Sequence, residues 1–244
     1  MRNFRHLDPE VVVRGSDRSF YQPLHWKKPR IIFTCSMSDW FHPNADKWRN
    51  EAWEIIRKTP QHQYRILTKR PERINKSTMP ADWWPDGWAN QWKHVWLGVT
   101  CEMQYTIDKL HRMDQLRNIP CQIRWVSCEP TLDEITLDLH GFHLVVDGGE
   151  TGPHARPAQL DWFRNIRDQC AQAKVSYVHL QNGRALNNGK KCNCHKLPGY
   201  KPGVACPGRV PGCRLLDGQL YEQWPVTPHA PTPITPTPAV RKLP

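Results

Sequence analysis

The sequence predicts an α/β protein built on a partial parallel (β/α) barrel of about six strands, and three observations support this fold class. Six segments begin as apolar runs, which are typical of strands buried on both faces. Each run ends in polar residues, which places chemistry-bearing side chains at one end of every strand. Apolar residues at helical spacing separate several of the runs. The six segments are residues 29–39, 63–70, 94–102, 122–130, 143–153 and 175–183.

The fifth segment, HLVVDGGETGP, shows the design most clearly. Its apolar run ends at Asp147 and is followed by Gly148, Gly149 and Glu150, so a buried strand leads into a flexible loop and an acid. The two glycines either allow a ligand to approach the backbone closely or simply make a tight turn. Both interpretations are open from the sequence.

Helices are predicted between the strands. Residues 44–58 have a helical apolar pattern that Pro60 ends, and Pro71 opens a short helix after the second strand. One helix is predicted after the third strand, with Ile107, Leu110, Met113 and Leu116 on one face, and another carries Leu160, Phe163, Ile166 and Cys170. Residues 131–141 are short for a crossover, so a helix there has one or two turns or is absent.

The 244 residues are divided into four parts by composition. Residues 1–28 form an N-terminal extension, and residues 29–183 form the barrel. Residues 184–225 combine a Cys-rich metal-binding insert with a hairpin that turns at Asp217-Gly218. Residues 226–244 alternate proline with small residues and are expected to be a disordered tail.

Composition bears on partners and location. A formal net charge of +11 and a pI of about 9.4 favour an anionic partner such as nucleic acid. A protein partner is a second possibility. No apolar stretch approaches the roughly 20 residues of a membrane span, and no signal-peptide pattern is present. The chain is therefore expected to be cytoplasmic, without a membrane partner and with mostly reduced cysteines.

The strand ends supply the candidate cofactor-binding or substrate-binding residues. Because parallel strands end at one rim, mixed charges there can bind a zwitterionic cofactor or a polar substrate. Alternatively, they form ion pairs that close the top of the barrel. His154 and Arg156 either reach an anionic substrate or are solvated. No catalytic residue is assigned. The candidates are Ser36, Asp39, Lys69, Arg70, Glu102, Glu129, Gly148, Gly149, Glu150 and Gln181.

A second group of residues has metal-ligand chemistry. Four cysteines and a histidine lie within a Gly/Pro-rich stretch that has little apolar content with which to fold unaided. They fit a tetrahedral structural zinc site, with an iron–sulfur cluster or unpaired thiols as alternatives. The residues are Cys192, Cys194, His195, Cys206 and Cys213. Cys35, Cys101 and Cys128 follow strands and either line the pocket or pack as small hydrophobes, whereas Cys121 and Cys170 are expected in the core.

The motifs FTCSMSDWFH, ILTKRPER, VWLGVTCE, RWVSCEP, DGGETGPHARP and RLLDGQLYEQWP occur in order between Phe4 and Pro225. In this series the chain resembles the phage-associated three-Cys-motif family, a domain of unknown function regarded as similar to radical S-adenosylmethionine (SAM) enzymes. The resemblance implies a partial (β/α) barrel with an iron–sulfur cluster at its top and SAM across the strand ends. It also implies reductive cleavage of SAM to a 5′-deoxyadenosyl radical.

The chain departs from that family at the cysteines that name it. The family's clustered cysteines lie upstream of the region that matches Arg5 to Lys28, and here no cysteine precedes Cys35. A cluster that binds SAM needs three thiolates close together. We expect either a chain that lacks its first strand and cluster loop, which is favoured because the rim motifs are intact, or a protein that has lost the cluster.

Two main functions follow from these patterns. The first is a radical-SAM-like phage or prophage protein that modifies nucleic acid or nucleotides and lacks its cluster-binding segment. The second is a non-catalytic barrel, stabilised by zinc, that binds nucleic acid or a protein. A metal-dependent hydrolase is less favoured because the rim has no histidine cluster.

Overall fold

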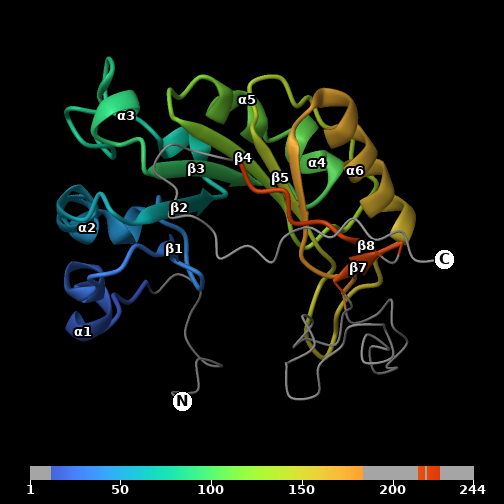
Figure 1. Ribbon diagram of the computed structural model, residues 1–244, viewed down its shortest axis with the longest axis horizontal. Coiled ribbons are helices and arrows are strands. Elements are labelled where there is room, and N and C mark those ends of the chain that lie inside the picture. The colour runs from blue at the N-terminus through green and yellow to red at the C-terminus, as the bar shows by residue number, and fades with distance from the viewer. Residues whose placement is uncertain (1–11, 184–213, 218, 226–244) are drawn as a thin grey trace.

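Six parallel strands form one sheet that curls into a half-barrel, as the sequence predicts (Figure 1). The computed structural model describes residues 12–183, 214–217 and 219–225. The strands pair in chain order, so each neighbour in the sequence is also a neighbour in the sheet. They are β1 (Ile31–Phe33), β2 (Gln63–Thr68), β3 (Val95–Thr100), β4 (Ile123–Cys128), β5 (Leu144–Asp147) and β6 (Ser176–His179).

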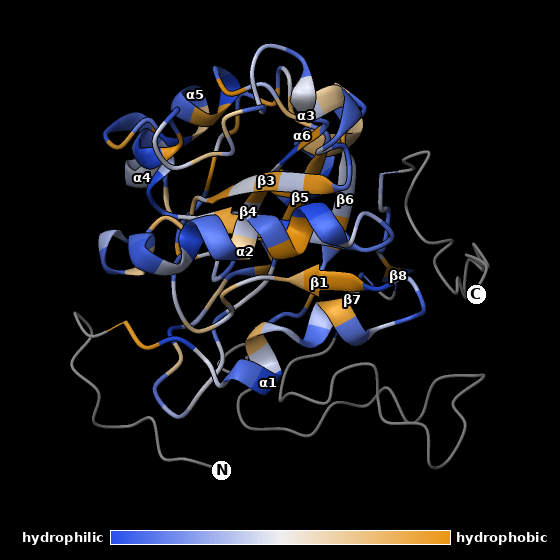
Figure 2. Cartoon of the chain, turned by 90° about the vertical axis from the view of Figure 1, so that its left-hand side faces the viewer, coloured by the Kyte–Doolittle hydropathy of each residue, from blue (hydrophilic) through white to orange (hydrophobic). Residues whose placement is uncertain are grey.

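Helices cover the convex face of this sheet and bury the main core. Two long helices, α2 (Asp46–Lys58) and α6 (Leu160–Ala173), are amphipathic, and Figure 2 shows the alternation of hydrophilic and hydrophobic residues along α2. Trp53 and Ile56 of α2 and Phe163 and Ile166 of α6 are at most 2% exposed within this core. The short helical segments are α1 (Asp17–Phe20), η1 (Gln22–His25), η2 (Pro43–Ala45), η3 (Pro71–Arg73) and α3 (Gly87–Asn90).

The single helix predicted after the third strand is wrong, because two short helices occur there. They are α4 (Gln104–Asp108) and α5 (Arg112–Arg117). His111 has a φ of 48°, and this left-handed backbone cannot continue a right-handed helix. Leu110 consequently lies 37% exposed, whereas Met113 and Leu116 are buried as predicted. Residues 131–141 contain no helix, which is one of the predicted alternatives.

The predicted hairpin forms and packs against the barrel. Strands β7 (Leu215–Leu216) and β8 (Gln219–Leu220) pair antiparallel around Asp217. The chain then runs beside β6, where His179 N donates to Tyr221 O and Gln223 N donates to Tyr177 O, each at 3.0 Å. This segment therefore extends the edge of the sheet, although its composition grouped it with the Cys-rich insert.

The concave face of the half-barrel carries a second, smaller core. Alternate residues of the strands point to it, including Trp96, Trp125 and Val146. Gly98 makes room for Trp125, because a Cβ atom at Gly98 would lie 2.3 Å from the indole. The indole of Trp125 thus lies across the neighbouring strand β3.

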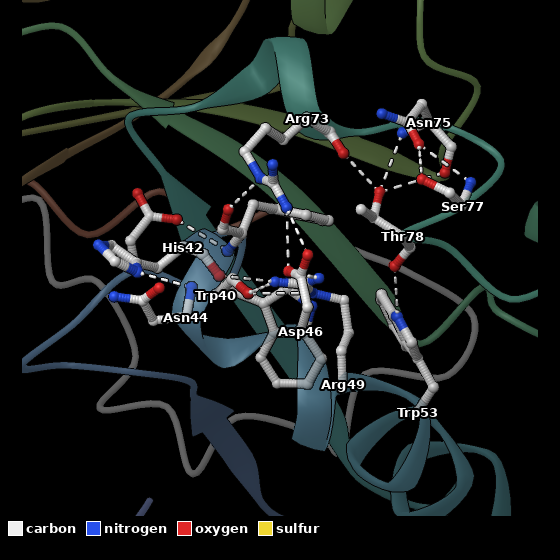
Figure 3. Close-up of polar contacts among 12 residues, drawn as sticks. Trp40, His42, Asn44, Asp46, Arg49, Trp53, Arg73, Asn75, Ser77 and Thr78 are labelled. Carbon is white, nitrogen blue, oxygen red and sulfur yellow. Dashed lines mark hydrogen bonds and ion pairs between the residues drawn. The ribbon is translucent and has the colours of Figure 1, made fainter. Parts of the chain in front are cut away.

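A network of arginines fixes the connection from β1 to α2 and to η3 (Figure 3). Arg49, which is 5% exposed, donates to Trp40 O and His42 O at 3.0 Å each. Arg73 donates to Phe41 O at 2.7 Å and to both oxygens of Asp46. Burial opposes ionisation of Asp46, but the bonds from the two guanidinium groups outweigh it and lower the pKa of the carboxyl.

The close packing at Gly98 generates a stability prediction. Gly98→Ala is expected to lower the free energy of unfolding by about 1–3 kcal/mol, because the added methyl overlaps the Trp125 ring. Gly15→Ala is the matched control, since its Cβ would come no closer than 3.7 Å to Ser19. Urea unfolding followed by fluorescence measures both. Equal stabilities of the two variants would contradict this packing.

Candidate functional site

The polar residues predicted at the strand ends lie along the C-terminal rim of the half-barrel, where they fall into separate groups. The carboxylate of Asp39, which follows β1, is hydrogen-bonded and ion-paired to neighbouring residues. This carboxylate accepts from Thr68 Oγ1 at 2.7 Å, from Lys69 N at 2.8 Å and from Phe41 N at 2.8 Å. Arg70 lies 3.3 Å from the same carboxylate. These bonds tie the loop after β1 to the end of β2.

A second group centres on Glu102, which follows β3 and is 8% exposed. Its carboxylate pairs with Lys69 and accepts from Arg112 Nη1 at 2.9 Å. Arg112 also donates to Thr100 O at 2.8 Å, so α5 is locked to the end of β3. Arg112 is absent from the residues predicted at the rim, because nothing in the helical pattern shows that it faces there.

Glu150, after β5, is paired within its own loop. Arg156 donates to it through the backbone N at 2.7 Å and through its side chain at 2.9 and 2.8 Å. These bonds lower the pKa of Glu150 to about 2. Arg156 therefore orders the loop, and its guanidinium is engaged by Glu150. Ser36 lies exposed in the turn after β1, and no hydrogen bond within the described parts of the chain joins it to the other candidates.

Glu129 differs from the other rim acids, because no cation among the described residues pairs with it. Among the residues that the structure describes, its carboxylate accepts one hydrogen bond, from Gln181 Nε2 at 3.5 Å, a long and weak contact. Gln181 Oε1 is shielded from solvent and has no donor in the part of the chain that the structure describes. Burial raises the pKa of Glu129. Gly148 lies beside the pair, since its Cβ would be 3.3 Å from Glu129 Oε1 and 3.5 Å from Gln181 Cγ. The structure thus brings Glu129, Gly148 and Gln181 together.

A buried network, not predicted from the sequence, lies at the strand ends that precede Gly148 and Gln181. Asp147 and His179, at the ends of β5 and β6, are both 0% exposed. His179 Nδ1 lies 2.7 Å from Asp147 Oδ1, and its Nε2 lies 2.9 Å from Asn182 Oδ1. Tyr177 Oη donates to Asp147 Oδ2 at 2.8 Å. Burial raises the pKa of Asp147, although its hydrogen bonds oppose the shift. In the sequence, the signal that could have identified this network is a polar residue, Asp147 or His179, at the end of each of these two apolar runs.

Two glycines let the loops after β5 and β6 touch. A Cβ at Gly149 would lie 2.5 Å from Asn182 O, and Gly149 N donates to Gln181 O at 2.8 Å. Gly183 has a φ of +81°, a conformation that favours glycine. Gly149 therefore allows the backbones of the two loops to touch, whereas Gly148 lies beside the Glu129–Gln181 pair.

The described cysteines do not fit an iron–sulfur cluster. Cys101, Cys128 and Cys170 are buried on the convex side, where burial raises the pKa of each thiol, to about 12 for Cys101 and Cys170. A cluster that binds SAM needs three thiolates placed around one point. Cys35 lies apart and exposed. No metal-binding group of three or more His, Cys, Asp or Glu side chains occurs within residues 12–183, 214–217 and 219–225.

Two further expectations concern core cysteines and a metal site. Cys121 and Cys170 are buried, as expected. The five proposed zinc ligands Cys192, Cys194, His195, Cys206 and Cys213 lie outside the described residues.

A hollow of about 750 Å³ lies away from the rim, between residues 136–142 and the end of α6. Asn165, Gln169 and Lys174 are among its lining residues. It is lined by none of the site residues predicted from the sequence, so it does not join the rim groups.

One comparison with known proteins gave a match. The model of a family described as a protein of unknown function (DUF5131) matches residues 2–225. The chain belongs to this family. No curated protein and no solved structure was found to match it. Among the helices that the structure describes, none is long and apolar enough to cross a membrane.

The buried network of this family member predicts a large effect of Asp147. Asp147→Leu leaves Tyr177 and His179 without their buried acceptor, and each unsatisfied group costs about 1–3 kcal/mol. The free energy of unfolding is therefore expected to fall by at least about 2 kcal/mol in urea titrations. Asp161→Asn is the control, because the Asp161 side chain is 83% exposed. A loss no larger than that of the control would contradict a structural role for Asp147.

Proposed function

We propose that the protein binds a small polar ligand with an amino group at the rim, between Glu129, Gly148 and Gln181. The observation that carries the proposal is a pair of oxygen acceptors without an adequate donor. Glu129 has one weak hydrogen bond, and Gln181 Oε1 has none among the described residues. An ammonium group donates up to three hydrogen bonds and carries the charge that a partly buried carboxylate lacks.

The electrostatics of the rim support this ligand chemistry. Burial raises the pKa of Glu129, and the nearby carboxylate of Asp147 raises it further, whereas Gln181 and His179 oppose the shift. Perturbed carboxyls of this kind are concentrated at functional sites. The other rim acids, Asp39, Glu102 and Glu150, already have cationic partners. Glu129 is therefore the rim acid best suited to receive a cation from outside.

SAM is the first ligand to test, because its methionine part carries an ammonium group and is joined to a nucleoside. The half-barrel is the fold that the resemblance to radical-SAM-like proteins implies, and this resemblance supports the choice of SAM. We include phage association and nucleic-acid or nucleotide modification in the proposal. The described cysteines do not hold a cluster, so no radical step is assigned to the described residues. Within this proposal Glu129 and Gln181 bind and orient the amino group, and Gly148 allows close approach.

A second candidate function rests on charge. Residues 184–213 contain six Lys and Arg residues and no Asp or Glu, and the whole chain carries +11. A zinc-stabilised segment of this charge on a non-catalytic barrel would bind nucleic acid through phosphates. Metal analysis of anaerobically purified protein and of the Cys192→Ser, Cys206→Ser variant separates the candidates. Zinc that is lost in the variant supports the second function, whereas iron with sulfide supports the first.

The rim proposal predicts how SAM binding responds to Glu129. In calorimetric titrations, Glu129→Gln is expected to weaken SAM binding by about tenfold or more, because a charge-assisted hydrogen bond is lost. Glu72→Gln, which changes an exposed carboxylate, is expected to bind as the unmodified protein does.

The same proposal predicts a pH dependence. Because the pKa of Glu129 is raised, its negative charge disappears as the pH falls toward that raised value. SAM binding should therefore weaken on acidification in the unmodified protein, and this component should vanish in Glu129→Gln. An unmodified protein that does not bind SAM, or a variant that binds it equally well, would contradict the proposal.

A further inference from the structure

Arg65 lies on the concave face of the half-barrel, in one layer with Phe33 and Trp96. The strand register places Phe33 of β1 opposite Arg65 of β2, and Arg65 opposite Trp96 of β3. Side chains of one layer on the same face of a sheet are close neighbours. A guanidinium is thus placed among aromatic rings inside the curve of the sheet.

The guanidinium of Arg65 is held between two indole rings. Its Cζ lies 4.7 Å from the ring centroid of Trp96 and 4.0 Å from that of Trp224. Nε donates to Gln63 Oε1 at 3.0 Å. Only Nε has a hydrogen-bond acceptor among the described residues, so the other N–H groups of Arg65 are the part available for an oxyanion.

Arg65 also lacks the acidic partner that other buried arginines have. Arg49 pairs with Asp46, and Arg112 pairs with Glu102. No carboxylate of the described residues forms an ion pair with Arg65. Burial therefore acts without compensation and lowers the pKa of the Arg65 guanidinium to about 10. A partly buried cation without a counter-charge is costly unless a ligand supplies one.

Two indole N–H groups on the same face also have no acceptor. Trp96 and Trp125 are 1% and 4% exposed, and in each the Nε1 atom is shielded from solvent without a hydrogen-bond partner in the described chain. Buried polar groups are as a rule hydrogen-bonded, so two such donors beside an unpaired cation point to an acceptor from outside. This observation is independent of the charge of Arg65.

An aromatic surface is accessible next to these donors. Phe33 is 46% exposed, and its ring centroid lies 6.3 Å from that of Trp125. Exposed aromatic faces bind planar groups such as nucleobases by stacking. Donors for an anion and a surface for a flat ring therefore lie on neighbouring strands.

We infer that the Arg65 site, formed by Phe33, Arg65, Trp96, Trp125 and Trp224, binds an aromatic anion of the nucleoside monophosphate class. The phosphate accepts hydrogen bonds from the outer edge of Arg65 and from the indole N–H groups, and the base stacks on Phe33. The inference goes beyond the rim proposal, since it uses different residues and a ligand group of opposite charge.

Calorimetric titration with AMP, adenosine and inorganic phosphate at constant ionic strength tests this site. The unmodified protein is expected to bind AMP more tightly than adenosine. Arg65→Met should weaken AMP binding by about tenfold or more and leave adenosine binding within about twofold. Arg30→Met is the matched control, because Arg30 also stacks on an indole, that of Trp26, but is exposed.

Arg65→Lys keeps the positive charge and provides a second measurement if Arg65→Met does not fold. Because an ammonium cannot form the bidentate contact, AMP binding should be weaker than in the unmodified protein. Equal binding of AMP and adenosine by the unmodified protein, or unchanged AMP binding in Arg65→Lys, would overturn the inference. Glu129→Gln should leave AMP binding unchanged, so failure of this site and failure of the rim proposal give different results.

Discussion

A fully buried carboxylate constrains the functional end of this half-barrel. Asp147 ends β5 inside the core, where an ionised group is stable only with hydrogen-bond partners, and Tyr177 and His179 of β6 provide them. The pairing fixes the ends of the two strands relative to each other. The ends of the two strands also fix where the following loops begin. These loops carry Gly148, Gly149, Gln181 and Asn182. The geometry of the Glu129–Gln181 pair therefore depends on the network of Asp147, Tyr177 and His179. The carboxylate and the imidazole of this network are fully buried.

The rim and the concave face present opposite unsatisfied chemistry. At the rim, Glu129 accepts one long hydrogen bond and Gln181 Oε1 has no donor, whereas at the Arg65 site two indole N–H groups have no acceptor among the described residues. The other rim acids are paired: Asp39 with Arg70, Glu102 with Lys69 and Arg112, and Glu150 with Arg156 of its own loop. Asp39 and Glu102 thus join neighbouring loops, and Glu129 is the acid for which we propose a ligand.

The fold was predictable because the strands of a parallel sheet leave apolar runs in the sequence, although the edge strand β1 is half exposed at Ile31 and Phe33. The six runs and the amphipathic helix at Leu160–Ala173 are all present. The break at His111 was missed because it depends on one backbone angle and leaves the apolar spacing unchanged. The partners of the rim acids were missed for another reason. Arg112, a partner of Glu102, lies on α5 beyond the break at His111, so spacing in the sequence does not show that the two charges are paired.

The most direct test is the pKa of Glu129, measured by ¹³C NMR of labelled carboxyl groups and assigned with Glu129→Gln. In the free protein we expect a pKa above the ordinary value of 4.5, because burial opposes ionisation and no cation of the described chain compensates. Addition of SAM should lower it, because an ammonium at the rim favours the charged carboxylate. A pKa at or below the ordinary value that SAM does not change would contradict the central claim that Glu129 receives the ligand's amino group.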